Sequence, residues 1–226
     1  MKVIAFPFAG GNKYSYQKFS QNNSNFVVIE YPGRGKRIKE ELIIDINSLI
    51  EDLLPQIKNE INSCDDYIIY GHSMGGLIGY LICHKIEQLG IKKPLKFVVS
   101  GRNPPFFKKG KMISCFLNEE FWKEVTKMGG IPDEVSNHPD LIDFYLPILK
   151  SDFTAVENYK HVLEGKLNIP IDVFYGSDEG IKAEDIIGWK DMNTHEVTIN
   201  QMIGNHFFIF DHIDFFKDYF LSTIKQ

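Results

Sequence analysis

Short apolar runs alternate along this chain with longer stretches whose apolar residues recur every three or four positions. A bounded apolar run is typical of a buried strand, whereas the longer period is that of an amphipathic helix. The runs lie at 3–8, 25–30, 67–70, 96–100, 169–175 and 195–199, and the helical stretches at 45–62, 77–89, 183–191 and from the last loop to about 225. Strands that alternate with helices predict an α/β fold, with a mostly parallel central sheet and helices on both faces.

The helical pattern at 45–62 contains a proline, Pro55. A proline inside a helix removes a backbone hydrogen bond and collides with the preceding turn. We therefore expect a kink or a restart of the helix at this residue.

The alternation of strands and helices stops between 106 and 159. This segment shows amphipathic helical pieces at 118–128, 138–149 and 152–159, and no strand pattern. A helical insertion between two strands of such a sheet predicts a lid over an active site. A peripheral helical decoration is the alternative. With 226 residues the chain fits one domain, 1–226, that carries this insertion.

The strand at 67–70 runs into a helix through Gly71-His72-Ser73-Met74-Gly75. A strand, a glycine-flanked serine and a helix in this order predict a nucleophile elbow. The two glycines let the strand and the helix approach each other, and the sharp turn lifts the serine hydroxyl above the edge of the sheet. The alternative is an ordinary turn in which Ser73 caps the helix.

Two backbone N–H groups are candidates for stabilising an oxyanion. The N–H of Met74 stands at the N-terminus of the new helix, where the helix dipole favours negative charge. The second donor is expected in the turn at 6–11, after the first strand. Ala9 is the first candidate and Phe8 the second, because Pro7 has no N–H. A plain turn before a helix is the alternative.

A serine hydroxyl needs a base within hydrogen-bond reach before it can act as a nucleophile. Of the seven histidines, His206 alone follows the last strand in a loop, between a small residue and two aromatic ones. We predict His206 as the general base, and His72 as a support for the elbow. The remaining histidines fall in or beside predicted helices, the lid or the last strand: His84, His138, His161, His195 and His212.

The acid that orients the base is expected after the carboxyl end of a strand, where sites form in such sheets. Asp178 has this place, in a Gly-Ser-Asp turn after the strand at 169–175. We expect Glu179 to point elsewhere and Asp185 to lie too far along, in a helix. The order Ser73, Asp178, His206 is that of the α/β-hydrolases. The sequence therefore predicts a Ser-His-Asp triad on an α/β-hydrolase fold.

Composition mainly excludes classes of protein. The formal net charge of -5 argues against nucleic acid as the main partner. No apolar stretch approaches the ~20 residues of a membrane span, and the first apolar run is too short for a signal peptide. The three cysteines have no metal spacing and are expected to be reduced and mostly buried: Cys64, Cys83 and Cys115. We expect a cytoplasmic protein without metal or cofactor, and monomeric by default.

Two basic clusters leave alternatives open. The first lies in a Pro-Gly-Arg-Gly loop and is either solvated or in contact with a phosphate or an acidic partner: Arg34, Lys36 and Arg37. The second begins the predicted lid and is either solvated or attractive to an acidic partner: Lys108, Lys109 and Lys111.

Several motifs follow one another along nearly the whole chain. They are Phe6-Pro-Phe-Ala-Gly-Gly11, Tyr31-Pro-Gly-Arg-Gly35, Gly71-His-Ser-Met-Gly-Gly76, Ser100-Gly-Arg102, Gly129-Gly-Ile-Pro132, Leu146-Pro-Ile-Leu-Lys-Ser-Asp152 and Gly204-Asn-His-Phe-Phe208. In this order they resemble the type II (external) thioesterases that accompany non-ribosomal peptide and polyketide synthases. The acid loop departs from the family, because Glu179 and Gly180 stand where a second Asp and a Pro are expected.

The resemblance implies hydrolysis of acyl or aminoacyl thioesters on the 4'-phosphopantetheine arm of an acyl or peptidyl carrier protein. Such an enzyme edits or releases intermediates of a synthase, with Ser73 attacking the thioester. Aromatic residues of the lid would line a channel for the arm and a short acyl chain, or form the core of the lid itself: Phe106, Phe107, Phe116, Phe121 and Trp122. The alternatives are a general small-molecule esterase, an acyl-CoA thioesterase, and an inactive hydrolase fold that serves as a scaffold.

Overall fold

The computed structural model describes residues 1–21, 23–107, 110–131, 133–162 and 165–223. Its strands form one sheet of six in the order β2-β1-β3-β4-β5-β6, and every neighbouring pair is parallel. The strands are β1 (Lys2–Phe6), β2 (Phe26–Val28), β3 (Tyr67–His72), β4 (Phe97–Ser100), β5 (Ile171–Gly176) and β6 (Val197–Met202). All their carboxyl ends therefore meet at one edge, as expected for the predicted α/β fold.

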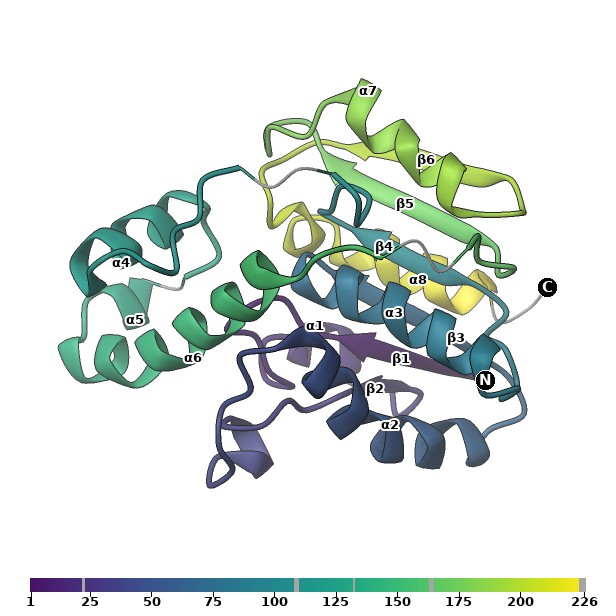
Figure 1. Cartoon of the computed structure of the whole chain (residues 1–226), viewed down its shortest axis with the longest axis horizontal. Coiled ribbons are helices and arrows are strands. Elements are labelled where there is room, and N and C mark those ends of the chain that lie inside the picture. The colour runs from purple at the N-terminus through teal and green to yellow at the C-terminus, as the bar shows by residue number, and fades with distance from the viewer. Residues whose placement is uncertain (22, 108–109, 132, 163–164, 224–226) are drawn as a thin grey trace.

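Helices cover both faces of the sheet (Figure 1). Successive side chains of a strand point to opposite faces. On one face, Ile4 and Phe6 pack in a cluster with α2 (Ile46–Asn62), α3 (Met74–Gln88) and the 3-10 helix η2 (Ile187–Met192). On the other, Val3 and Ala5 pack in a cluster with α1 (Gln17–Ser20) and α8 (Ile213–Thr223). Burial on both sides explains why the strands read as unbroken apolar runs.

Helix α2 shows how local signals set its start. The side chain of Asp45 accepts a hydrogen bond of 2.8 Å from the N–H of Ser48, which caps the first turn. Of the kink or restart expected at Pro55, the restart is wrong, because α2 runs without interruption to Asn62. The buried residues Leu53, Leu54 and Ile57 on both sides of the proline pack against the core and keep the helix together.

The chain between β4 and β5 is helical, as predicted. It holds α4 (Asn118–Lys127), α5 (Asp133–Ser136) and α6 (Pro139–Asn158), which extend beyond the end of the sheet in Figure 1. Two helical pieces were predicted where the single helix α6 is found. The segment has a small core of its own, made by Ile113, Phe121, Val125, Leu146 and Leu149.

Some boundaries in the last third of the chain differ from the predicted ones. The helix expected at 183–191 is a short α7 (Ala183–Ile186) followed by η2, and the strand expected at 195–199 is Val197–Met202. Another 3-10 turn, η3 (Phe208–Phe210), precedes α8, and η1 (Gly35–Arg37) lies in the Pro-Gly-Arg-Gly loop. Among the helices of the described residues, none has the length and apolar character needed to cross a membrane.

The cysteines do not all lie where they were expected. Cys83 is buried, Cys64 is half-buried and Cys115 is exposed, and all three are free thiols. The expectation of mostly buried cysteines is therefore right for Cys83 and wrong for Cys115.

Candidate active site

Ser73 occupies a strained turn between β3 and α3. Its φ is 55° and its ψ is -113°, and it is the only non-glycine residue with a positive φ among those described. Such a conformation costs of order 1–3 kcal/mol and persists only where the surroundings enforce it. The N–H of Ser73 donates to the Ser100 carbonyl at 2.9 Å, which ties the turn to β4. The geometry is that of the predicted nucleophile elbow.

The glycines around Ser73 are required by close backbone contact. A Cβ atom on Gly71 would overlap the Gly75 carbonyl, and one on Gly75 would overlap the Phe6 carbonyl at the end of β1. Any larger residue would therefore push α3 away from the sheet. This close approach joins the elbow to the turn that follows β1.

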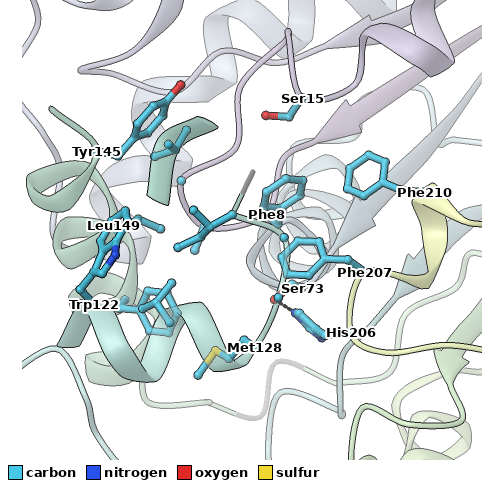
Figure 2. A pocket seen from close by; sticks show the side chains of 18 residues that line it. Phe8, Ser15, Ser73, Trp122, Met128, Tyr145, Leu149, His206, Phe207 and Phe210 are labelled. Atoms are coloured by element: carbon cyan, nitrogen blue, oxygen red, sulfur yellow. Dashed lines mark hydrogen bonds between the residues drawn. The ribbon is translucent and has the colours of Figure 1, made fainter. Parts of the chain in front are cut away.

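His206 lies in hydrogen-bond contact with Ser73. Its Nε2 is 3.0 Å from the Ser73 Oγ, and Figure 2 shows the two side chains meeting at one side of a pocket. His206 comes from the loop between β6 and η3, as predicted.

The carboxylate beside His206 belongs to Glu179. Its Oε2 lies 2.8 Å from Nδ1 of His206, and the Glu179 side chain is 0% exposed. Asp178 instead points to solvent, and its N–H donates to the Gly204 carbonyl at 2.9 Å. The prediction that Asp178 contacts the histidine while Glu179 points elsewhere is therefore wrong.

The turn after β5 explains this difference. The Asp178 N–H bond to Gly204 fixes the turn so that the next side chain, that of Glu179, folds back beneath it. Oε1 of Glu179 then accepts the N–H of Gly176 at 2.6 Å, which leaves Oε2 for the histidine. Spacing along the chain does not distinguish two adjacent carboxylates. The unusual Glu179 in the acid loop was the signal in the sequence.

His72 packs beneath the pair formed by Ser73 and His206. Its Nδ1 is 2.9 Å from the Ser100 Oγ, and its ring centroid is 5.0 Å from that of His206. Burial lowers the pKa of His72 well below its usual value, and the nearby His206 lowers it further. His72 thus packs as an uncharged side chain, as expected of a residue that supports the elbow.

The predicted oxyanion donors both border the site. Met74 is the first residue of α3, so its N–H has no partner within the helix. Ala9 lies in the turn after β1 and lines the pocket that contains Ser73. Within the described part of the chain, the Ala9 N–H donates to no protein acceptor, whereas Gly10 and Gly11 both do. The N–H of Phe8, the second candidate, lies near the Tyr16 hydroxyl. Burial raises the pKa of Tyr16, and this N–H partly offsets the rise.

A cavity of about 460 Å³ opens beside Ser73 and His206. No Asp, Glu, Lys or Arg among the described residues lines it. Trp122 from α4 lies across it from Ser73 in Figure 2, and Leu149 from α6 and Met128, just after α4, also line it. The arrangement offers a hydroxyl beside a base, next to an apolar space and free N–H groups, which is what acyl transfer requires. Within the described residues, no group of three His, Cys, Asp or Glu is placed to hold a metal ion.

A family described as "Thioesterase domain" matches residues 1–225. The chain belongs to this family. The resemblance based on the motifs is thereby confirmed, and the chain is a thioester hydrolase.

Named relatives of this thioesterase support the same assignment. It is 26% identical over 216 residues to the gramicidin S biosynthesis protein GrsT of Aneurinibacillus migulanus, covering 93% of this chain and 84% of GrsT. It is 26% identical over 238 residues to the medium-chain S-acyl fatty acid synthase thioesterase of Rattus norvegicus, covering 99% and 88%. Among solved structures, ClbQ from the colibactin NRPS/PKS pathway superposes with a TM-score of 0.88 at 26% identity, covering 99% of this chain and 96% of ClbQ.

The lid aromatics of the thioesterase divide between the two predicted roles. Trp122 lines the cavity, while Phe121 is buried in the small core of the helical segment. Phe116 packs at the edge of that core. Phe106 and Phe107 are partly exposed, at 45% and 37%, and do not line the cavity. Of these five aromatic residues, Trp122 alone lines the cavity beside Ser73, and their role in a substrate channel stays a prediction.

The arginines of the first basic cluster form ion pairs within the protein. Arg34 is 3% exposed and pairs with Asp152, while Arg37 pairs with Asp52 and Glu40. Neither guanidinium is free to bind a phosphate. In the second cluster Lys111 is exposed, 3.9 Å from a Glu124 oxygen, and Lys108 and Lys109 lie outside the described residues.

Proposed function

We propose that this thioesterase uses Ser73 as nucleophile, His206 as general base and Glu179 as the acid that orients the base. The observation that carries the proposal is the pair of hydrogen bonds that joins the three side chains, 3.0 Å from Ser73 to His206 and 2.8 Å from His206 to Glu179. The buried carboxylate holds Nδ1 protonated and leaves Nε2 to accept the serine proton. Glu179 therefore replaces Asp178 in the predicted triad.

The reaction proceeds in two halves. In the first, the Ser73 oxygen attacks the thioester carbonyl as its proton passes to Nε2 of His206, and the tetrahedral oxyanion accepts hydrogen bonds from the N–H groups of Ala9 and Met74. Collapse of this species breaks the carbon–sulfur bond, and His206 returns the proton to the departing thiolate. In the second, His206 activates a water molecule that releases the acid from Ser73.

The substrate we propose is an acyl or aminoacyl group on the 4'-phosphopantetheine arm of a carrier protein. The names of GrsT and ClbQ, which refer to peptide and polyketide pathways, support this assignment. The enzyme would then edit or release intermediates of a synthase. It needs no cofactor of its own, and we propose a cytoplasmic monomer.

The helical segment at 106–159 fits a lid over this substrate. Trp122 and Leu149 face the cavity from α4 and α6, and the glycine turn at 129–130 packs on Phe207, beside His206. We propose that the acyl chain occupies the cavity while the arm enters past the lid. Attraction of an acidic carrier by Lys108, Lys109 and Lys111 stays a prediction.

A general esterase or acyl-CoA thioesterase is the alternative function. The uncharged cavity is equally suited to an acyl chain on coenzyme A, since it contacts the acyl group rather than the carrier. The names of the relatives favour the carrier-bound substrate, and a comparison between carriers tests it directly.

The experiment compares three substrates with the same acyl group: the acyl carrier protein, the acyl-CoA and a p-nitrophenyl ester. Ser73→Ala serves as the control for each. We expect the largest kcat/KM for the carrier-bound thioester and no turnover above background in the variant. Equal kcat/KM for all three substrates would instead favour the general esterase, and turnover by Ser73→Ala would overturn the serine mechanism.

A further inference from the structure

We infer that three buried side chains, Tyr31, Arg34 and Asp152, are positioning residues that fix the Ala9 N–H for the oxyanion. We call them the loop clamp, because together they hold the turn at 7–11. The inference rests on the proposed function, in which the Ala9 N–H is an oxyanion donor. The three residues come from two places far apart in the chain, the loop after β2 and the helix α6.

The centre of the loop clamp is a buried ion pair. Arg34 donates to both carboxylate oxygens of Asp152, at 2.6 Å from Nη1 and 2.7 Å from Nη2. The two side chains are only 4% and 2% exposed. Burial is the largest single effect and lowers the pKa of Arg34, but the charge and hydrogen bonds of Asp152, together with Tyr31 and Glu30, raise it, and the net change is upward. The Arg34 guanidinium therefore stays charged beneath the protein surface.

This ion pair reaches the turn directly. The Oδ2 atom of Asp152 accepts the N–H of Gly10 at 2.7 Å, and Nη1 of Arg34 donates to the Gly11 carbonyl at 3.4 Å. Gly10 has a φ of +77°, and a Cβ on it would overlap the side chain of Leu149 on α6. The turn is thus pressed against the same helix that supplies Asp152.

Three successive peptide planes are held by separate hydrogen bonds. The Tyr31 hydroxyl donates to the Pro7 carbonyl at 2.9 Å, the Gly11 N–H donates to the Phe8 carbonyl at 2.9 Å, and the Gly10 N–H donates to Asp152. In a trans peptide the C=O and the N–H point in opposite directions. Since the Phe8 carbonyl is turned inward toward Gly11, the Ala9 N–H of the same peptide is turned the other way. The hydrogen bonds that hold the neighbouring peptide planes therefore set the orientation of the Ala9 N–H.

Stability alone does not require charges at this place. An apolar pair of similar volume often stabilises a buried site as well as an ion pair does. An apolar pair, however, offers no acceptor for the Gly10 N–H. What Asp152 adds is that acceptor, and the two hydrogen bonds from Arg34 hold it in position.

Two double variants separate positioning from stability. Arg34→Met with Asp152→Leu replaces the pair by apolar side chains and removes the acceptor. Arg34→Met with Asp152→Asn also removes the charges but leaves an amide oxygen for the Gly10 N–H. Asp52→Asn is the matched control, since it weakens the neighbouring Arg37 ion pair, which makes no hydrogen bond to the turn. Rates are expressed per active site titrated with a fluorophosphonate, so that only folded enzyme is counted.

We expect the Leu double variant to lose kcat by about 10–100-fold with KM within about twofold, as for a partly misplaced oxyanion donor. The Asn double variant should recover most of the lost kcat, and Asp52→Asn should keep the wild-type value. Wild-type kcat in the Leu variant, equal losses in both doubles, or a loss confined to KM would overturn the inference.

A milder variant covers the case in which the doubles do not fold. Tyr31→Phe removes one hydroxyl and its hydrogen bond to Pro7 while keeping the ring. The loop clamp predicts a severalfold lower kcat at an unchanged KM, and a wild-type kcat would overturn it. Ser73→Ala, measured in parallel, tests the proposed function itself. An inactive Ser73→Ala together with fully active clamp variants would reject the loop clamp alone.

Discussion

The Oε2 atom of Glu179 lies 2.8 Å from Nδ1 of His206, while the adjacent Asp178 points to solvent. This contact predicts that two isosteric substitutions have very different effects on kcat. Glu179→Gln should lower kcat by about 10²–10⁴-fold, because an amide does not hold the histidine in the required tautomer. Asp178→Asn should leave kcat within about twofold of wild type, as expected for an exposed side chain.

Steady-state hydrolysis of one thioester by both variants checks this prediction. A large loss in Asp178→Asn with a small one in Glu179→Gln would restore the acid expected from the sequence. Thermal unfolding of both proteins controls for damage to the fold.

Because α3 lies close against the end of β1, one methyl group added between them should markedly lower the free energy of unfolding. Gly75→Ala places a Cβ against the Phe6 carbonyl, so we expect a loss of about 3 kcal/mol in the free energy of unfolding, the upper range for overpacking. Gly110→Ala is the control, because no heavy atom of the described residues, its chain neighbours aside, lies within 4 Å of the added Cβ. Urea unfolding measures both. A Gly75→Ala protein as stable as Gly110→Ala would contradict the packing described for the elbow.

The buried His72 predicts that stability falls in acid. Its pKa is lowered in the folded protein by burial, so the unfolded chain binds the proton more readily. The stability that His72 contributes is therefore complete above about pH 6.5, the usual histidine pKa, and is lost as the pH falls below it. The slope reaches at most about 1.4 kcal/mol per pH unit for one such group.

Urea unfolding between pH 7.5 and 5 should show this slope, and His72→Gln should make it shallower by up to that amount. An unchanged slope in His72→Gln would show that the imidazole is not kept neutral by the fold.

The apolar cavity predicts an effect of chain length on catalysis. Trp122 lies across the cavity from Ser73, so it can contact a medium-length acyl chain but not an acetyl group (Figure 2). Trp122→Ala should lower kcat/KM for an octanoyl thioester by about tenfold, equivalent to losing about 1.4 kcal/mol of apolar contact. The acetyl thioester should react at the wild-type rate. Equal losses for both chain lengths would place the acyl chain outside the cavity.

Local patterns in the sequence were sufficient for the elbow and the base. Gly71, Ser73 and Gly75 act within one turn between a strand and a helix, so their spacing alone reports the geometry. His206 was found because its position after the last strand decides which edge of the sheet it reaches. The strand order could be anticipated only as a parallel α/β sheet.

Contacts between distant segments were not accessible in this way. The choice between Asp178 and Glu179 depends on a hydrogen bond from the first of them to Gly204, more than twenty residues away. The Arg34 interaction with Asp152 spans 118 positions, so the sequence could not decide whether the loop cluster at 34–37 is solvated or in contact with a phosphate or an acidic partner. Such pairings follow from tertiary packing and leave no periodic signal in the sequence.

The central claim is that Ser73 takes the acyl group from a carrier-bound thioester. Rapid mixing of the enzyme with acyl-phosphopantetheinyl carrier protein, followed by acid quench and mass spectrometry, tests it most directly. We predict that the peptide containing Ser73 transiently gains the mass of the acyl group, and that Ser73→Ala neither gains this mass nor releases the free acid. Release of the acid with no acyl group on Ser73, or acylation of another residue, would contradict the claim.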